Sequence, residues 1–307
     1  MRLTRRELAF AAAGLLACNK APAVVSRSVR RVAQALPVLQ TMDGAGVRLN
    51  RIIGQPALRH LDPFILLDRF HSANPDDYVR GFPDHPHRGF ETVTVMLEGR
   101  FRHRDSKGNH GVITGGGAQW MTAGKGIVHS EMPDQSDGLL SGFQLWINLP
   151  RAEKLCLQHY EDMAPEKVLA GNLPAGRLKI ISGEVEGLRG PLPPRSTQPT
   201  LFTLTLDSDR PLELDVASGH AAFVFVHQGD VEVGPEGAPS AGAGTLAVLG
   251  EGNRLRLRAL SAPSAVLVAA GKPLAEPIVQ RGPFVMNSEA EIEQAFADYR
   301  AGVLDRS

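Results

Sequence analysis

The sequence predicts an all-β protein with two consecutive domains of antiparallel strands and one helix at the C-terminus. Its 307 residues include 32 glycines and 22 prolines, which interrupt many short apolar segments rich in β-branched residues. No long helical pattern separates these segments, which argues against a parallel α/β sheet and favours antiparallel sandwiches or barrels. The length suffices for two domains with their own cores, and the composition changes near Pro150, where we place the boundary.

The first domain is expected over residues 37–150. Apolar segments alternate here with turns that contain Gly, Pro, Asn or Asp. The expected strands are residues 47–53, 64–67, 91–97, 100–104, 112–113, 119–122 and 143–149. Three glycines at positions 115–117 are expected to form a positive-φ corner of a tightly curved sheet.

The second domain is expected over residues 151–287. Residues 151–160 have the composition of a helical turn, and a loop rich in Gly and Pro spans residues 187–199. The strands expected after this loop are residues 201–206, 212–216, 222–226, 231–233, 245–249, 255–257 and 265–269. Their short, regular spacing predicts a second antiparallel sandwich or barrel.

A helix is predicted over residues 288–303. Ser288 and Glu291 form a capping box, in which each side chain can satisfy a free backbone N–H at the helix start. The apolar residues fall on one helical face at i, i+3, i+4 and i+7, and Gly302 can end the helix. The stripe consists of Ile292, Ala295, Phe296 and Tyr299. We interpret it as core packing.

The first 23 residues indicate an export signal rather than a structural element. Arg5 and Arg6 precede an apolar run over residues 8–17, which is too short to span a bilayer and resembles a twin-arginine signal. Cleavage after residues 21–23 and lipidation at Cys18 are both open. We expect a tether over residues 24–36 and a periplasmic protein that meets the membrane only through the signal or a lipid. A leader that is not a signal would leave the protein cytoplasmic.

The composition excludes several classes of partner. Lys and Arg number 33, Asp and Glu also 33, and the basic residues are scattered, so we expect no binding to nucleic acid. The two cysteines, Cys18 and Cys156, lie far apart, and a disulfide framework is not expected.

Two short clusters carry the chemistry of the chain. His85 and His87 are two residues apart, as are His129 and Glu131, so on strands each pair projects to one side. If two strands bring these faces together, three imidazoles and one carboxylate meet. Such a set suits one divalent first-row metal ion: iron, manganese, nickel or copper, and also zinc. The sequence therefore predicts a metal site.

Several other side chains compete with or qualify this ligand set. Glu91 keeps the strand parity of His87 and is an alternative oxygen ligand, and the spacing does not choose between Glu91 and Glu131. His103 and His110 lie in turn-rich sequence and are expected to be solvated. His60, His71 and His159 show no cluster and are interpreted as structural or exposed.

The second half lacks a comparable cluster. His220 and His227 are seven residues apart and therefore of opposite strand parity, so they should not share a metal ion. Residues 245–257 contain no histidine. We expect the second domain to be a metal-free scaffold.

The same residues resemble a known family. The first half contains HPHRGFETVTVMLEG, HRDSKGNHG, QWMTAGKGIVHSEMP and GFQLWINLP. The second half contains ISGEVEG and EPIVQRGPFVMNSEAEIEQAFADYRAG. These segments are similar to the pirin family over nearly the whole chain after the leader. The resemblance implies two consecutive cupin domains, each a jelly-roll β-barrel, with one iron ion in the first.

The resemblance also implies a ligand set and a function. The family's metal ligands map onto His85, His87, His129 and Glu131, which leaves Glu91 as a neighbouring or barrel-interior group. Fe(2+) is therefore the expected ion, and an activity of the quercetin 2,3-dioxygenase type follows, with a flavonol-like aromatic substrate and O₂ as partners. Glu131 would be a ligand, and either also the catalytic base or a ligand alone. A monomer is expected.

A second function is also implied. Some members of the family are regulatory proteins, so the metal could alter a binding surface in a redox-responsive way without turnover. A metal-dependent isomerase or hydrolase has less support, because no further acid–base pair lies near the clusters.

Overall fold

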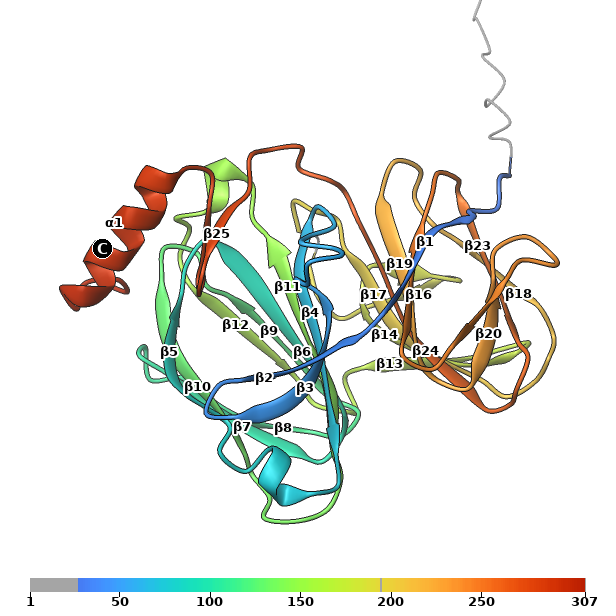
Figure 1. Cartoon of the computed structure of the whole chain (residues 1–307), viewed down its shortest axis with the longest axis horizontal. Helices are drawn as coiled ribbons and strands as arrows, with labels where there is room; N and C mark the ends of the chain where they lie inside the picture. The colour runs from blue at the N-terminus through green and yellow to red at the C-terminus, as the bar shows by residue number, and fades with distance from the viewer. Residues whose placement is uncertain (1–26, 194, 307) are drawn as a thin grey trace, which may run out of the picture.

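Two β-barrels lie side by side in the computed structural model, which describes residues 27–193 and 195–306 (Figure 1). Each barrel combines a seven-stranded and a four-stranded antiparallel sheet, the pattern of a jelly roll. The export signal expected over residues 1–23, including Cys18, lies outside the described residues and stays a prediction. The all-β prediction with two cupin domains is confirmed.

The first barrel holds the sequence that carries the histidine clusters. Its large sheet has the strand order β12-β9-β6-β11-β4-β3-β2 and its small sheet the order β5-β10-β7-β8. The strands of the large sheet are β2 (Leu39–Asp43), β3 (Val47–Ile53), β4 (Phe64–Ser72), β6 (Phe90–Glu98), β9 (Ala118–Thr122), β11 (Leu140–Asn148) and β12 (His159–Met163). Those of the small sheet are β5 (Phe82–His87), β7 (Arg100–Asp105), β8 (His110–Thr114) and β10 (Ile127–Pro133). Two 3₁₀ turns, η1 (Pro75–Asp77) and η2 (Arg151–Glu153), complete it.

The second barrel follows the same plan. Its sheets have the orders β1-β22-β19-β24-β17-β14-β13 and β18-β23-β20-β21. The strands of the large sheet are β1 (Val32–Pro37), β13 (Leu169–Leu173), β14 (Gly176–Ser182), β17 (Thr200–Leu206), β19 (Ala221–Gln228), β22 (Thr245–Leu249) and β24 (Ser264–Gly271). Those of the small sheet are β18 (Leu212–Asp215), β20 (Asp230–Val233), β21 (Ser240–Gly242) and β23 (Arg254–Ala259). Two hairpins lie outside these sheets, β15 (Glu184–Val185) with β16 (Leu188–Arg189) and β25 (Val279–Arg281) with β26 (Phe284–Met286).

The first and last elements of the described residues each pack on the barrel that is farther from them in sequence. The tether expected over residues 24–36 instead contains most of β1, which pairs with β22 of the second barrel. At the other end, β25, β26 and the helix cross back to the first barrel, and α1 lies beside it at the upper left of Figure 1. The expected boundary at Pro150 also shifts, because β12 pairs with β9 and extends the first barrel to Met163.

An apolar core joins the two barrels. Phe64 meets Phe223 edge to face with ring centroids 5.2 Å apart, and Phe143 meets Phe225 in the same way at 5.9 Å. All four rings are fully buried. Buried aromatic side chains contribute large apolar areas, so this interface holds the barrels in one fixed arrangement.

The helix α1 (Glu289–Arg300) begins as the capping box predicts. The Ser288 hydroxyl accepts a hydrogen bond from the backbone N–H of Glu291, and the Glu291 carboxylate accepts one from the N–H of Asn287. Ile292 and Ala295 are buried against β26, whereas Tyr299 is 40% exposed, so the apolar stripe packs only in part.

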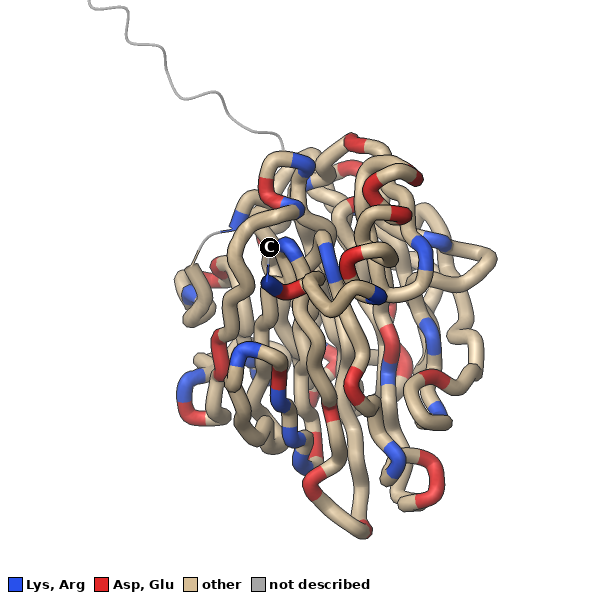
Figure 2. The backbone as a smooth tube through the Cα atoms, turned by 90° about the vertical axis from the view of Figure 1, so that its left-hand side faces the viewer, with Lys and Arg blue, Asp and Glu red and all other residues tan. Residues whose placement is uncertain are grey.

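The distribution of charged residues agrees with the composition. Figure 2, viewed from the side of the first barrel, shows basic and acidic residues interspersed along the backbone. Among the described residues, no helix is long and apolar enough to cross a membrane.

Candidate metal centre

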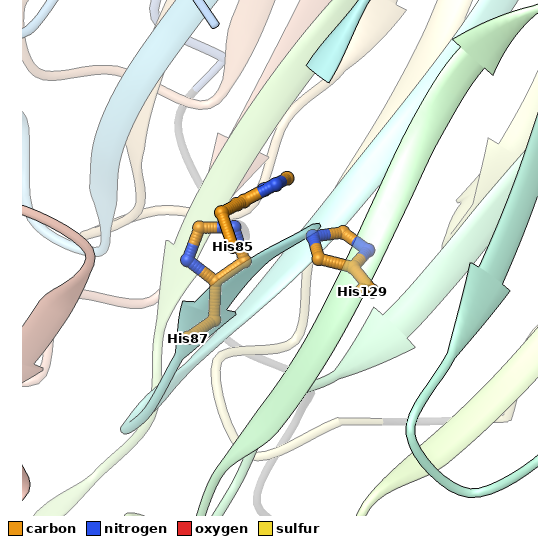
Figure 3. A group of neighbouring side chains, drawn as sticks. All are labelled: His85, His87 and His129. Atoms are coloured by element: carbon orange, nitrogen blue, oxygen red, sulfur yellow. The ribbon is translucent and has the colours of Figure 1, made fainter. Parts of the chain in front are cut away.

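Three histidines meet inside the first barrel, as the sequence predicted. His85 and His87 lie on β5 and His129 on β10, and the two strands pair with His129 opposite His85. One ring nitrogen of each histidine lies within 4.8 Å of those of the other two, and the rings converge in Figure 3. The ring centroids of His85 and His129 are 4.4 Å apart. This spacing matches three imidazoles around one ion.

Hydrogen bonds to backbone carbonyls define the protonation of two of these rings. Nδ1 of His85 lies 2.8 Å from the carbonyl oxygen of Pro83, and Nδ1 of His87 lies 3.3 Å from that of Pro283. A carbonyl oxygen only accepts, so each Nδ1 carries a proton, and in the neutral ring Nε2 is the nitrogen with the free lone pair. Carbonyl partners of this kind orient metal-binding histidines in many proteins.

The third ring, that of His129, has no hydrogen-bond partner among the described residues. Both of its nitrogens are buried and unpaired. Burial lowers the pKa of His87 and of His129 well below the usual value, and the neighbouring histidines add to the effect. Neutral imidazoles with unmet lone pairs cost free energy in a protein interior, and a bound cation would satisfy them. The residues present therefore fit a divalent metal ion.

Glu131 lies two residues beyond His129 on β10, after an irregularity in the pairing of β10 with β5. Its carboxylate is buried on the wall of a cavity that His85 and His87 also line, outside the group formed by the three histidine nitrogens. It accepts hydrogen bonds from Oγ1 of Thr94 at 3.1 Å and from Nε2 of Gln144 at 3.2 Å. Burial raises the pKa of Glu131, while His85 and these two donors oppose the rise. Its ligation of the metal stays a prediction.

Glu91, the competing oxygen ligand, faces away from the histidines. Its carboxylate accepts a hydrogen bond from Oγ1 of Thr122 at 2.8 Å and lies 3.8 Å from Nε of Arg195, in a separate cavity near the interdomain connection. The expectation of a barrel-interior group was wrong, because the parity count assumed one continuous strand. The extended conformation is interrupted at Gly89, where φ is +89°. The next strand, β6, begins at Phe90, whose side chain points toward the histidines, so that of Glu91 lies on the opposite face of the sheet.

The expectation that His103 is solvated was also wrong. His103 is only 2% exposed, it stacks on Tyr160 with centroids 5.4 Å apart, and its Nε2 lies 3.4 Å from Oδ2 of Asp162. The sequence did hold a signal. On β7 the exposed residues Arg100, Arg102 and Arg104 alternate with buried Phe101 and His103, which is the period of a half-buried strand.

The other histidines behave as expected. His60, His71, His110 and His159 are exposed. In the second barrel His220 and His227 are not part of a metal-binding group among the described residues.

His85 and His87 line a cavity of about 1100 Å³. Aromatic side chains line much of it, namely Phe70, Phe82, Phe101 and Trp146. Arg51 and Asp68 form a bidentate ion pair on its wall, with Nε–Oδ1 and Nη2–Oδ2 distances of 3.0 and 2.8 Å. The C-terminal segment closes one side through Ile278, Val279 and Pro283. Neither the ion pair nor the C-terminal wall was predicted, because both depend on contacts between distant parts of the chain.

Two jelly-roll barrels in one chain define a bicupin, and among the described residues only the first barrel has a histidine group that could hold a metal ion. The sequence pattern of the Pirin family matches residues 46–147, and that of the Pirin C-terminal cupin domain matches residues 201–305. The chain belongs to the pirin family.

Relatives and solved structures agree with this assignment. A Pseudomonas aeruginosa protein named "Putative quercetin 2,3-dioxygenase" is 49% identical, over 85% of this chain and 93% of the relative. Mouse pirin is 40% identical over 89% of this chain and 93% of its own length. The crystal structure of a quercetin 2,3-dioxygenase from Acinetobacter baumannii superposes with a TM-score of 0.83 at 31% identity, covering 90% of this chain and 99% of that one.

A more distant structure shows the fold alone. A bacterial pirin from Escherichia coli, solved in complex with nickel(II), gives a TM-score of 0.60 at 20% identity over 80% of this chain and 98% of its own.

Proposed function

We propose that this protein is a metal-dependent dioxygenase that opens the ring of flavonol-like substrates with O₂. The observation that carries the proposal is the set of three converging imidazoles, two of which, those of His85 and His87, lie on the wall of a large cavity with aromatic walls. Two relatives whose names read "Putative quercetin 2,3-dioxygenase", at 49% and 41% identity, add support.

The proposed metal ion is Fe(2+), held by His85, His87, His129 and Glu131. Iron accepts imidazole and carboxylate ligands and keeps positions open for further ligands. Manganese, nickel, copper and zinc would also accept this ligand set. When bound, the ion supplies a Lewis-acidic and redox-active centre that stabilises negative charge on a substrate oxygen.

Glu131 is proposed to accept the proton of the substrate hydroxyl on a carboxylate oxygen. Burial raises the pKa of Glu131, which favours its role as a base whenever the carboxylate is not bound to the metal ion. Gln144 donates to both carboxylate oxygens at 3.2 Å and so fixes the plane of the carboxylate. A carboxylate held in this way is positioned before substrate arrives.

The cavity suits a flat, partly polar aromatic molecule. Trp146 stacks on Phe90 with centroids 4.3 Å apart and meets His87 edge to face at 5.0 Å, which places an aromatic wall next to the histidines. Farther along the wall, the ion pair of Arg51 and Asp68 offers polar contacts for phenolic hydroxyls.

The test is gas exchange by anaerobically metal-loaded protein. We expect O₂ uptake and CO release when quercetin and O₂ are added to the iron-loaded protein. His129→Ala should lose both signals, whereas His110→Ala, which alters an exposed histidine of the same barrel, should keep them. Absence of gas exchange for several flavonols with iron, manganese and nickel would refute the proposal and favour a redox-responsive binding protein.

A further inference from the structure

The loop that follows the first histidine pair is fixed by the C-terminal segment. Arg88 is only 4% exposed, and its guanidinium donates to Oδ2 of Asp298 at 2.7 Å and to the carbonyl oxygen of Leu304 at 3.2 Å. The same group donates to the carbonyl oxygen of Lys125, four residues before His129. One side chain thus connects both histidine clusters to the C-terminal segment of the chain.

A buried lysine makes a second connection between the histidine loop and the C-terminal segment, at Gly89. Lys154 is 1% exposed, and its ammonium donates to three oxygens: the carbonyl of Gly89 at 2.8 Å, Oδ1 of Asn148 at 2.7 Å and the carbonyl of Val285 at 2.9 Å. An ammonium has three N–H donors, so all of them are used. The three acceptors come from the loop after the histidines, from the end of β11 and from β26.

These contacts leave little freedom between the loop and β26. A methyl group on Gly89 would lie 2.1 Å from the carbonyl oxygen of Val285, so the two backbones are in direct contact. The backbone N–H of Val285 donates to the carbonyl oxygen of Arg88 at 3.1 Å. Two residues before Val285, the carbonyl of Pro283 accepts from Nδ1 of His87. The position of β26 therefore decides where the acceptor for the His87 ring lies.

From this geometry we infer that Lys154 is a positioning residue of the metal centre, which holds β26 against the histidine loop and so aims Nε2 of His87 at the metal. The inference rests on the metal centre of the proposed function and not on the reaction catalysed there. It also gives the C-terminal segment a role at the metal centre, because that segment supplies the acceptors for His87, Arg88 and Lys154.

The chain offers a matched control for this role. Arg30 is another cation with 1% exposure whose hydrogen bonds go to backbone carbonyls of three residues, Ala217, His220 and Gly250, at 2.8 to 3.1 Å. Its acceptors belong to the second barrel. Loss of either cation removes three hydrogen bonds to protein oxygens, and both changes should destabilise the fold. Only the loss of Lys154 should reach the metal centre.

The experiment compares Lys154→Met with Arg30→Met, both loaded with Co(II) in the full-length protein. Affinity is measured by competition with a chelator, and ligand geometry by the visible spectrum of Co(II). We expect Lys154→Met to bind Co(II) about 10–100-fold more weakly than the parent, as is usual when the support of a metal-binding histidine is lost, and to have an altered spectrum. Arg30→Met should keep the parent affinity and spectrum.

Other outcomes would count against the inference. Parent affinity and spectrum in Lys154→Met would overturn it, as would equal changes in both variants. If Lys154→Met does not fold, Asn148→Ala replaces it in the test, because this change removes one hydrogen-bond acceptor of Lys154. We expect Asn148→Ala to bind Co(II) about 3-fold more weakly than the parent. Unchanged Co(II) affinity would overturn the inference. A parent protein that binds no Co(II), Fe(II), Mn(II) or Ni(II) would refute the proposed function itself, together with the inference that rests on it.

Discussion

Replacement of Glu131 by Gln tests the two roles proposed for this carboxylate, as a metal ligand and as a base. The substitution keeps the shape of the side chain and removes its negative charge and its basicity. An amide has one acceptor oxygen, so the substituted side chain would keep the bond from Thr94 and one bond from Gln144 at most. Glu131 is 5% exposed and its hydrogen-bond donors are neutral, so loss of the charge should not destabilise the fold.

The expected effect on catalysis is large. A positioned general base contributes about 10²–10⁴-fold to a rate, which corresponds to about 3–5 kcal/mol of transition-state stabilisation. The kcat/KM for O₂-dependent quercetin loss should therefore fall by at least about 100-fold. Some metal should remain bound, because the three imidazoles are intact.

The assay is O₂ uptake with quercetin, with bound iron measured in the same samples. Glu91→Gln is the matched control, because Glu91 is a glutamate of the same barrel with 2% exposure whose carboxylate lies in the other cavity. It should keep activity within about 2-fold of the parent, since it touches neither substrate nor metal in our account. Parent kcat/KM and parent metal content in Glu131→Gln would refute both roles assigned to this residue.

Three further predictions concern the fold, the pH dependence and the metal. Gly89→Ala should lower the free energy of unfolding in urea by about 1 kcal/mol for its positive φ and by about 1–3 kcal/mol more for the contact with Val285. Gly108→Ala, with the same φ of +89° and open space, should show only the first loss, and equal losses would contradict the steric argument. Burial lowers the pKa of His227 to about 3, with Arg69 adding to the effect, so the unfolded chain binds one more proton than the folded chain between about pH 3 and pH 6.5. The free energy of unfolding therefore falls on acidification. His227→Gln should reduce the slope of this free energy against pH, between pH 4 and pH 6, by up to about 1.4 kcal/mol per pH unit. An unchanged slope would rule out the assigned role of His227. Removal of the metal with a chelator should lower the melting temperature and abolish O₂ uptake, and re-addition of Fe(II) should restore both. A chelated protein that still consumes O₂ with quercetin would speak against metal-dependent turnover.

Local patterns in the sequence predicted most of the strands and the three histidines. The H-x-H spacing fixed the face of His85 and His87, and the antiparallel pairing of β5 with β10 then brought His129 opposite them. The capping box at Ser288 likewise predicted the start of α1. Each of these features depends on residues within one strand or one helical turn, where period and capping chemistry decide the outcome.

Features that depend on distant contacts could not be predicted. The pairing of β1 with the second barrel and the return of β26 to the first join residues more than 190 positions apart in sequence, and no local pattern encodes such partners. The orientation of Glu91 depended on a break at Gly89, which required knowledge of the backbone at that residue. Edge strands such as β2 and β13 escaped detection because they are half exposed and carry little alternation.

The most direct test of the central claim is an isotope experiment on the iron-loaded protein with quercetin under ¹⁸O₂. If the metal centre formed by His85, His87 and His129 supports dioxygenation, mass spectrometry should find two ¹⁸O atoms in the ring-opened product, and His129→Ala should yield none. Turnover with no ¹⁸O in the product, or equal incorporation by His129→Ala, would contradict the account.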